Sequence, residues 1–203
     1  MDRKRKLYHN IFHFLPEQFN SLFKDGPVTI DFPTDTELAD AYQLINDAVD
    51  KELGFGSDEY PNLEYLLDAM THDSVLPFVV KEPLSKKVVG FFFIAPTRFH
   101  RGVNPLYCDM NIVLQSSYRT LEYLNDLLNS VVWRFVEILG YEGFIGEHLT
   151  NDDEGLRNLV KLQGYEILGR LPCVTQLKHS GPVDSVIIMR RFNKDAKLVS
   201  HFG

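Results

Sequence analysis

The chain has 203 residues and a formal net charge of −7, with 44% hydrophobic and 24% charged residues. This length fits one domain, and this composition is that of a globular protein rather than a disordered or fibrous one. The acidic balance disfavours a phosphate-backbone partner, so we expect no nucleic-acid binding.

No apolar run approaches the roughly 18 residues of a membrane span, and no long apolar stretch follows the basic start as in a signal peptide. We therefore expect no membrane partner and a cytoplasmic protein. The two cysteines, Cys108 and Cys173, exclude a disulfide framework and a four-thiolate zinc site.

The chain divides into an N-terminal extension over residues 1–26, one folded domain over 27–193 and a C-terminal tail over 194–203. In the extension, only Ile11 to Phe23 is amphipathic, and Pro16 interrupts it early. The domain opens with a predicted strand, Val28 to Phe32, stopped by Pro33.

Two helices are predicted next. Thr34 and Glu37 have the spacing of a capping box, and apolar residues recur at helical intervals from there to Gly54. A second helix is expected from Asn62 to His72.

The middle of the chain changes to strand patterns. β-Branched and aromatic residues fill Leu76 to Lys81 and Lys87 to Ala95, which predicts a hairpin. A polar loop, Thr97 to Pro105, leads to a further strand, Leu106 to Leu114.

The last part alternates helices and strands. The strongest apolar stripe predicts a helix from Thr120 to Leu139, ended by Gly140. The elements that follow are a strand, a helix and two strands, namely Glu142 to His148, Asp152 to Gln163, Tyr165 to Leu171 and Val183 to Phe192. Strand–helix–strand passages favour parallel neighbours in a mixed sheet. The predicted fold class is α+β, a mixed seven-stranded sheet flanked by about four helices.

This order of elements, over residues 28–192, resembles the GNAT superfamily, the Gcn5-related N-acetyltransferases. Tyr118-Arg119 and the pair Leu127-Leu128 stand where the family has its turn and third helix, and Leu149 to Asp153 followed by Gly164-Tyr165 is similar to the family's second half. The resemblance implies an enzyme that moves an acetyl group from acetyl-CoA to a small amine or amino-acid substrate by direct attack.

The chain departs from the family at two places. Thr120, Glu122 and Leu124 replace the glycines of a helix start that binds the pyrophosphate of acetyl-CoA through backbone N–H groups. Two unit charges about 6 Å apart repel by roughly 3 kcal/mol at an effective dielectric of about 20, so the Glu122 carboxylate disfavours phosphates there. The family has a tyrosine that protonates the leaving thiolate, and it should fall near Val160. No tyrosine stands there in this chain.

These departures leave alternatives open. One is a catalytically inactive GNAT-fold binding protein, and another is an acyltransferase whose pantetheine donor is carried by a protein. A sheet protein unrelated to the family is the third.

The resemblance also implies donor-binding residues. Backbone N–H groups of Leu114, Gln115 and Ser116 would hold the acyl and pantetheine groups, with Arg119 and Thr120 beside the pyrophosphate. Arg119 is otherwise a surface arginine near a helix start. Asn151 or Asp153 would contact the pantetheine arm, or else cap the helix that follows.

Carboxylates on the two strands that splay around the donor are the candidate general bases. Asp109 and Glu147 lie in these strands, and partial burial would raise their pKa values toward neutrality. Alternatively, both face outward from alternating strands. His148 is another candidate base, whereas Tyr107 and Cys108 are weaker candidates.

The acceptor pocket is expected between the loops Gly54 to Tyr60 and Thr97 to Pro105. The aromatic residues there would recognise an aromatic or small amine, or close the core; they are Phe55, Tyr60, Phe99 and His100. The seven histidines are scattered along the chain, so no metal site is expected. Edge strands allow a monomer or a homodimer.

Overall fold

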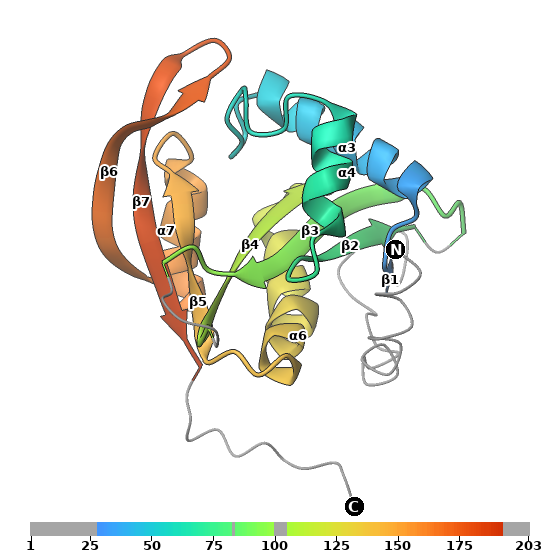
Figure 1. Cartoon of the computed structure of the whole chain (residues 1–203). Helices are drawn as coiled ribbons and strands as arrows, with labels where there is room; N and C mark the ends of the chain where they lie inside the picture. Colours follow the sequence, from blue (N-terminus) through green and yellow to red (C-terminus); the bar gives the residue numbers. More distant parts are fainter. Residues whose placement is uncertain (1–27, 83, 100–104, 193–203) are drawn as a thin grey trace, which may run out of the picture.

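A seven-stranded sheet organises the computed structural model, which describes residues 28–82, 84–99 and 105–192 (Figure 1). Its strand order is β1-β2-β3-β4-β5-β7-β6. The strands are β1 Thr29–Asp31, β2 Leu76–Lys81, β3 Val88–Pro96, β4 Tyr107–Leu114, β5 Gly143–Leu149, β6 Glu166–Leu177 and β7 Gly181–Arg191. The β4–β5 pair is parallel and the other pairs are antiparallel. The predicted α+β class with a mixed sheet is confirmed. The N-terminal extension with its amphipathic piece, the C-terminal tail and His100 lie outside the described residues.

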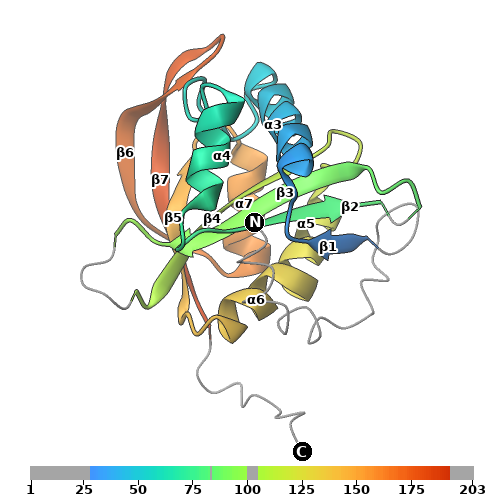
Figure 2. The same ribbon diagram turned by 45° about the vertical axis from the view of Figure 1, so that its right-hand side comes forward.

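Helices cover both faces of the sheet (Figure 2). One face carries α3 Asp35–Asp50 and α4 Leu63–Thr71, and the other carries α5 Leu121–Leu127, α6 Trp133–Ile138 and α7 Asp153–Gln163. A π-helical turn, Leu128–Val132, joins α5 to α6 without a break, so these segments form the one long helix that the sequence predicts. Within the described residues, no helix is both long and apolar enough to cross a membrane.

Local sequence signals fix several helix ends. Thr34 and Glu37 form the predicted capping box, with N–H to side-chain oxygen distances of 2.8 and 3.2 Å. Asp152 caps α7 by accepting the N–H of Gly155 at 3.0 Å. Neither Asn151 nor Asp153 is the cap, so that expectation is wrong. Asn151, Asp152 and Asp153 can all cap a helix, so the path of the chain after β5 decides which of them does so.

The last hairpin is longer than the sequence pattern predicts. β6 runs on to Leu177 instead of ending at Leu171, through an irregularity in its pairing with β7 between Leu171 and Thr175. Pro172 cannot donate a backbone hydrogen bond, and Cys173 has a φ of +50°. Such residues normally end a strand, but here the bulge accommodates them and pairing resumes.

Two apolar cores sandwich the sheet. Toward α5 and α6, Phe78 stacks between Phe32, Phe92 and Phe135 at centroid distances of 4.7–5.1 Å. Cys108 is fully buried in this core, and burial raises the pKa of its thiol, which disfavours the thiolate form that a nucleophile needs. Toward α3 and α4, the core contains Leu38, Ile45, Leu66, Val79 and Val113.

The sheet opens between β4 and β5. These strands pair only at Tyr107 with Gly143 and at Cys108 with Phe144, whereas β4 continues to Leu114 and β5 to Leu149. Beyond Cys108 the two strands therefore diverge and leave an opening in the middle of the sheet.

Candidate active site

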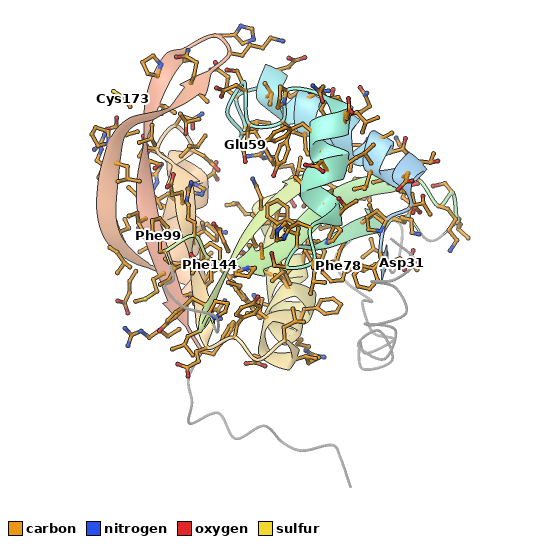
Figure 3. All side chains as sticks on the ribbon, viewed as in Figure 1. Asp31, Glu59, Phe78, Phe99, Phe144 and Cys173 are labelled. Atoms are coloured by element: carbon orange, nitrogen blue, oxygen red, sulfur yellow. The ribbon has the colours of Figure 1, made fainter. Side chains whose placement is uncertain are left out.

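A cavity of about 640 Å³ passes through the opening between β4 and β5. Alternation along the strands places Asp109 and Asn111 of β4 on the α3–α4 face, and Phe144 of β5 on the α5–α7 face. Figure 3 shows Glu59 near the upper end of the space between these strands and Phe144 lower on β5. The cavity therefore joins the two faces of the sheet, with a polar end on the first and an apolar end on the second.

Asp109 is a half-buried carboxylate at the polar end. Its Oδ1 accepts the N–H of Met110 at 2.8 Å. Burial raises the pKa of the carboxyl to about 6, and the negative charge of Glu147 adds to this, while Met110 and Arg98 act in the opposite direction. A Cβ at Gly146 would lie 2.3 Å from Asp109 Oδ1, so glycine at that position of β5 leaves room for the carboxylate.

Glu147 also lines the polar end, as predicted, but its oxygens already have partners. It forms an ion pair with Arg98, and Ser185 donates its hydroxyl hydrogen to Oε2 at 2.9 Å. These contacts occupy both carboxylate oxygens of Glu147, so an amine would have to displace Arg98 or Ser185 to reach them.

Glu59 is a third pocket carboxylate, which the sequence patterns do not single out. Its oxygens accept Asn111 Nδ2 at 3.1 Å and the N–H of Gly56 at 3.2 Å. Burial and the neighbouring charge of Asp109 raise the pKa of Glu59 above its ordinary value. The only sequence feature that could have indicated Glu59 was its place in the loop Gly54 to Tyr60, which was expected to border the acceptor pocket.

The aromatic residues expected around the acceptor have other positions. Phe55 is buried in the α3–α4 core, Tyr60 packs on that core against Tyr65, and Phe99 lies exposed below the Arg98 guanidinium. None of them lines the cavity. The sequence places these residues in loops but does not show where their side chains point, because packing decides that.

The roof of the cavity, which we define as the contact between residues 50–57 and 176–180, joins two distant parts of the chain. The Glu52 carboxylate accepts the N–H groups of His179 and Ser180 and the Ser180 hydroxyl at 2.5–2.7 Å. Ser57 donates its N–H to the Gln176 carbonyl at 2.8 Å. Asp50 and Lys178 form an ion pair beside them.

Arg119 points into the cavity. Its Nη1 donates to the Leu53 carbonyl at 3.0 Å, and its Nη2 lies 3.8 Å from Asp152 Oδ2. His148 also lines the cavity, with Nε2 3.3 Å from the Asp152 carbonyl, and burial lowers the pKa of its imidazole. Asn151 does not line the cavity, since its amide donates to the Glu52 carbonyl at 2.7 Å.

The register of β4 decides which backbone groups face the opening. Gln115 donates its N–H to the Val89 carbonyl at 2.8 Å, and Thr97 donates to the Tyr107 carbonyl at 3.1 Å. The odd-numbered residues of β4 therefore bond to β3, and the N–H groups of Met110, Ile112 and Leu114 point toward β5. Of the N–H groups expected to hold the donor, that of Leu114 points toward the opening and that of Gln115 is bonded to β3. Met110 and Ile112 were not among the expected residues, because strand pairing sets this alternation.

Side chains occupy the start of α5. Thr120 is its N-cap, and the Thr120 hydroxyl accepts the N–H of Tyr123 at 3.2 Å. Glu122 is exposed in the first turn, and Ser116 accepts a hydrogen bond from Lys51 Nζ at 2.6 Å. The described residues contain no group of three or more histidine, cysteine or acidic side chains that would hold a metal ion.

No protein-family model and no curated protein matches the sequence. Solved structures do match. A Gcn5-related N-acetyltransferase from Kribbella flavida superposes with a TM-score of 0.66 at 13% identity, covering 81% of this chain and 98% of its own. A ribosomal-protein-alanine N-acetyltransferase from Brucella melitensis gives 0.63 at 20%, covering 81% and 99%. A phosphinothricin acetyltransferase from Sinorhizobium meliloti, solved with acetyl-CoA, gives 0.66 at 16%, covering 82% and 89%.

The chain has the GNAT fold. The fold expected from the order of elements is thus confirmed, and a sheet protein of unrelated fold is excluded. In this GNAT fold, the opening between β4 and β5 lies inside the sheet, and Val160 of α7 does not line the cavity.

Proposed function

We propose that the chain is an N-acetyltransferase that moves an acetyl group from acetyl-CoA to the amine of a small molecule. One observation carries the proposal: a single cavity brings a carboxyl group with a pKa of about 6 next to backbone N–H groups at the opening of the sheet. The GNAT fold that this chain shares with solved acetyltransferases supports it.

In this proposal Asp109 is the general base. A carboxylate with a pKa near neutrality accepts a proton from an ammonium ion at working pH more readily than an ordinary aspartate does. The freed amine nitrogen attacks the thioester carbonyl carbon from the α3–α4 face. The N–H group of Ile112 points into the opening, where it stabilises negative charge on the carbonyl oxygen, whereas the N–H of Met110 is bonded to Asp109 Oδ1. The carbon–sulfur bond then breaks, and the thiolate leaves.

The charge of the cavity favours a cationic acceptor. Asp58, Glu59, Asp109 and Glu147 line its polar end, against the single cation Arg98 among the described lining residues there. Such a surplus of negative charge raises the local concentration of an ammonium ion. A volume of about 640 Å³ lies in the range of small-ligand sites, roughly 300–1,000 Å³, which supports a small-molecule acceptor.

The cavity and the start of α5 fit different parts of acetyl-CoA unequally well. The apolar end of the cavity suits a thioester and a pantetheine arm. The start of α5 suits phosphates poorly, because Thr120 uses its hydroxyl as a cap and Glu122 adds a negative charge. Arg119, which the resemblance places beside the pyrophosphate, is bonded to Leu53 within the cavity. We therefore expect weak binding of free acetyl-CoA, and a donor carried on a protein is the second candidate.

Calorimetric titration with acetyl-CoA and with CoA tests the donor, and thiol release across a panel of amines tests the reaction. We expect micromolar to sub-millimolar binding and thiol release with a cationic amine. Asp109→Ala should lower the rate by at least about a hundredfold, whereas Asp40→Asn, which changes an exposed carboxylate of α3, serves as the matched control. Absence of binding at millimolar ligand would remove acetyl-CoA as donor, and S-acetyl-pantetheine would then be tested. If neither donor releases thiol with any amine, the transferase proposal is wrong and a binding protein remains.

A further inference from the structure

Helix α3 ends in a turn whose central residue is usually glycine. Leu53 donates its N–H to the Ala48 carbonyl at 2.8 Å, and Glu52 donates its N–H to the Val49 carbonyl at 3.1 Å, which is the hydrogen-bond pattern of a Schellman motif. Glu52 stands at the glycine position of this motif, with a φ of +55°. A side chain crowds the backbone in this conformation. The turn therefore stores strain, which the contacts of the Glu52 side chain must offset.

The Glu52 side chain is bonded to the turn between β6 and β7, more than a hundred residues later. Its carboxylate accepts the N–H groups of His179 and Ser180 and the hydroxyl of Ser180. Figure 1 shows this turn beside the end of α3. Hydrogen bonds to an ionised carboxylate are stronger than those between neutral groups. Glu52 thus fastens the final hairpin to the end of α3.

The main chain of the same turn contacts the other side of the cavity. The Leu53 carbonyl accepts Arg119 Nη1 at 3.0 Å, and the Glu52 carbonyl accepts Asn151 Nδ2 at 2.7 Å. These contacts use backbone oxygens, so they remain when the Glu52 side chain is replaced. The side chain and the main chain at this turn therefore hold different parts of the protein.

The two segments that Glu52 joins form two walls of the polar end of the cavity. The loop after α3 contributes Gly56 and Glu59 to the lining, and the hairpin contributes Val174 and Thr175. These walls lie close together, because a Cβ at Gly56 would be 2.9 Å from Thr175 Cγ2. Glu52 itself does not line the cavity. It can therefore affect a bound molecule only through the walls.

Resting on the proposed function, we propose that Glu52 is a positioning residue that sets the affinity of the site for the amine acceptor. By holding the hairpin against the end of α3, it fixes the separation of the wall that carries Glu59 from the wall that carries Thr175. Asp109 and the opening between β4 and β5 belong to the sheet. The general base and the donor therefore keep their positions when this link is lost.

The test compares Glu52→Gly with Glu52→Gln. Glycine suits the positive φ and removes the carboxylate, so the turn should persist while the link to the hairpin is lost. Glutamine retains a carbonyl oxygen that can accept the N–H groups of His179 and Ser180, and it should preserve the link. Lys86→Gly is the matched control, because Lys86 has a φ of +58° in the turn between β2 and β3 and does not line the cavity.

Steady-state kinetics use acetyl-CoA and the amine of the panel that releases thiol fastest. In Glu52→Gly we expect KM for the amine to rise at least about tenfold, while kcat and KM for acetyl-CoA change less than about threefold. Glu52→Gln and Lys86→Gly should stay within about twofold of the unmodified chain in all three constants. An unchanged KM for the amine, an equal rise in KM for acetyl-CoA, or equal defects in the Gly and Gln variants would each overturn the role of Glu52.

A second measurement does not depend on turnover. Ser57 donates its N–H to the Gln176 carbonyl at 2.8 Å, so hydrogen exchange at this amide reports whether the two walls remain joined. Exchange should be at least about tenfold faster in Glu52→Gly and within about twofold of the unmodified chain in Glu52→Gln. Unchanged exchange in Glu52→Gly would overturn the link itself. An unmodified chain that releases no thiol from any donor would instead refute the proposed function, and with it the acceptor role of Glu52, whatever the exchange result.

Discussion

Asp109→Asn should make the protein more stable and less active. The pKa of this carboxyl rises from 3.8 in the unfolded chain to about 6 in the fold, because burial disfavours its charged form. At about 1.4 kcal/mol per pKa unit, ionised Asp109 costs the fold up to roughly 3 kcal/mol at pH 7.5. Asparagine has nearly the same shape, carries no charge, and its carbonyl oxygen still accepts the N–H of Met110.

The sign and the pH range follow from the raised pKa. Below pH 3.8 the carboxyl is neutral in both states and costs nothing, and the stability of the fold falls as the pH rises from there through about 6. The stability gain of Asp109→Asn should therefore be near 1 kcal/mol at pH 4.5 and up to about 3 kcal/mol at pH 7.5. Urea unfolding of both proteins at these two pH values measures it, with Asp40→Asn as the surface control.

A pH-independent difference in unfolding free energy would refute this account of Asp109, as would a variant less stable than the unmodified chain at pH 7.5. Loss of activity alone would not distinguish the charge from the position of the group. The stability measurement is the more informative of the two, because it needs neither substrate.

The same site makes further predictions. With a saturating donor, kcat/KM for the amine should rise with pH through a midpoint of about 6 as Asp109 ionises, and a profile flat between pH 5 and 7 would contradict its role. Gly146→Ala would place a Cβ 2.3 Å from the Asp109 carboxylate and should cost about 1–3 kcal/mol of stability together with most of the activity. Gly169→Ala is its control, since no atom lies within 4 Å of the added Cβ. Glu52→Ala should speed amide hydrogen exchange at Ser180 by at least about tenfold, and unchanged exchange would mean that the roof does not depend on this carboxylate.

The order and type of the elements followed from local patterns. The capping box at Thr34 and the apolar stripe of the long helix involve contacts a few residues apart, and these were predicted correctly. The cap of α7 was not, because Asn151 to Asp153 are three adjacent residues of equal capping ability. Only the path of the chain out of β5 selects Asp152.

The site depended on contacts that sequence spacing does not record. Asp109 and Glu147 were predicted as candidate bases and both line one cavity, but sequence spacing does not show that Glu147 is ion-paired with Arg98. The backbone direction at Gln115 follows from pairing with β3. Glu59 reaches the cavity because the loop that carries it is bonded to Gln176, more than a hundred residues later.

The roof has a consequence for the order in which the site is completed during synthesis. Asp109 and the opening of the sheet are encoded before residue 150, whereas the partners of Glu52 and Ser57 in the roof lie at residues 176–180. A ribosome-bound chain that ends before β6 contains the residues of the α3–α4 core but lacks the roof partners of Glu52 and Ser57. The contacts that cover the acidic end of the cavity therefore form only once the final hairpin has emerged.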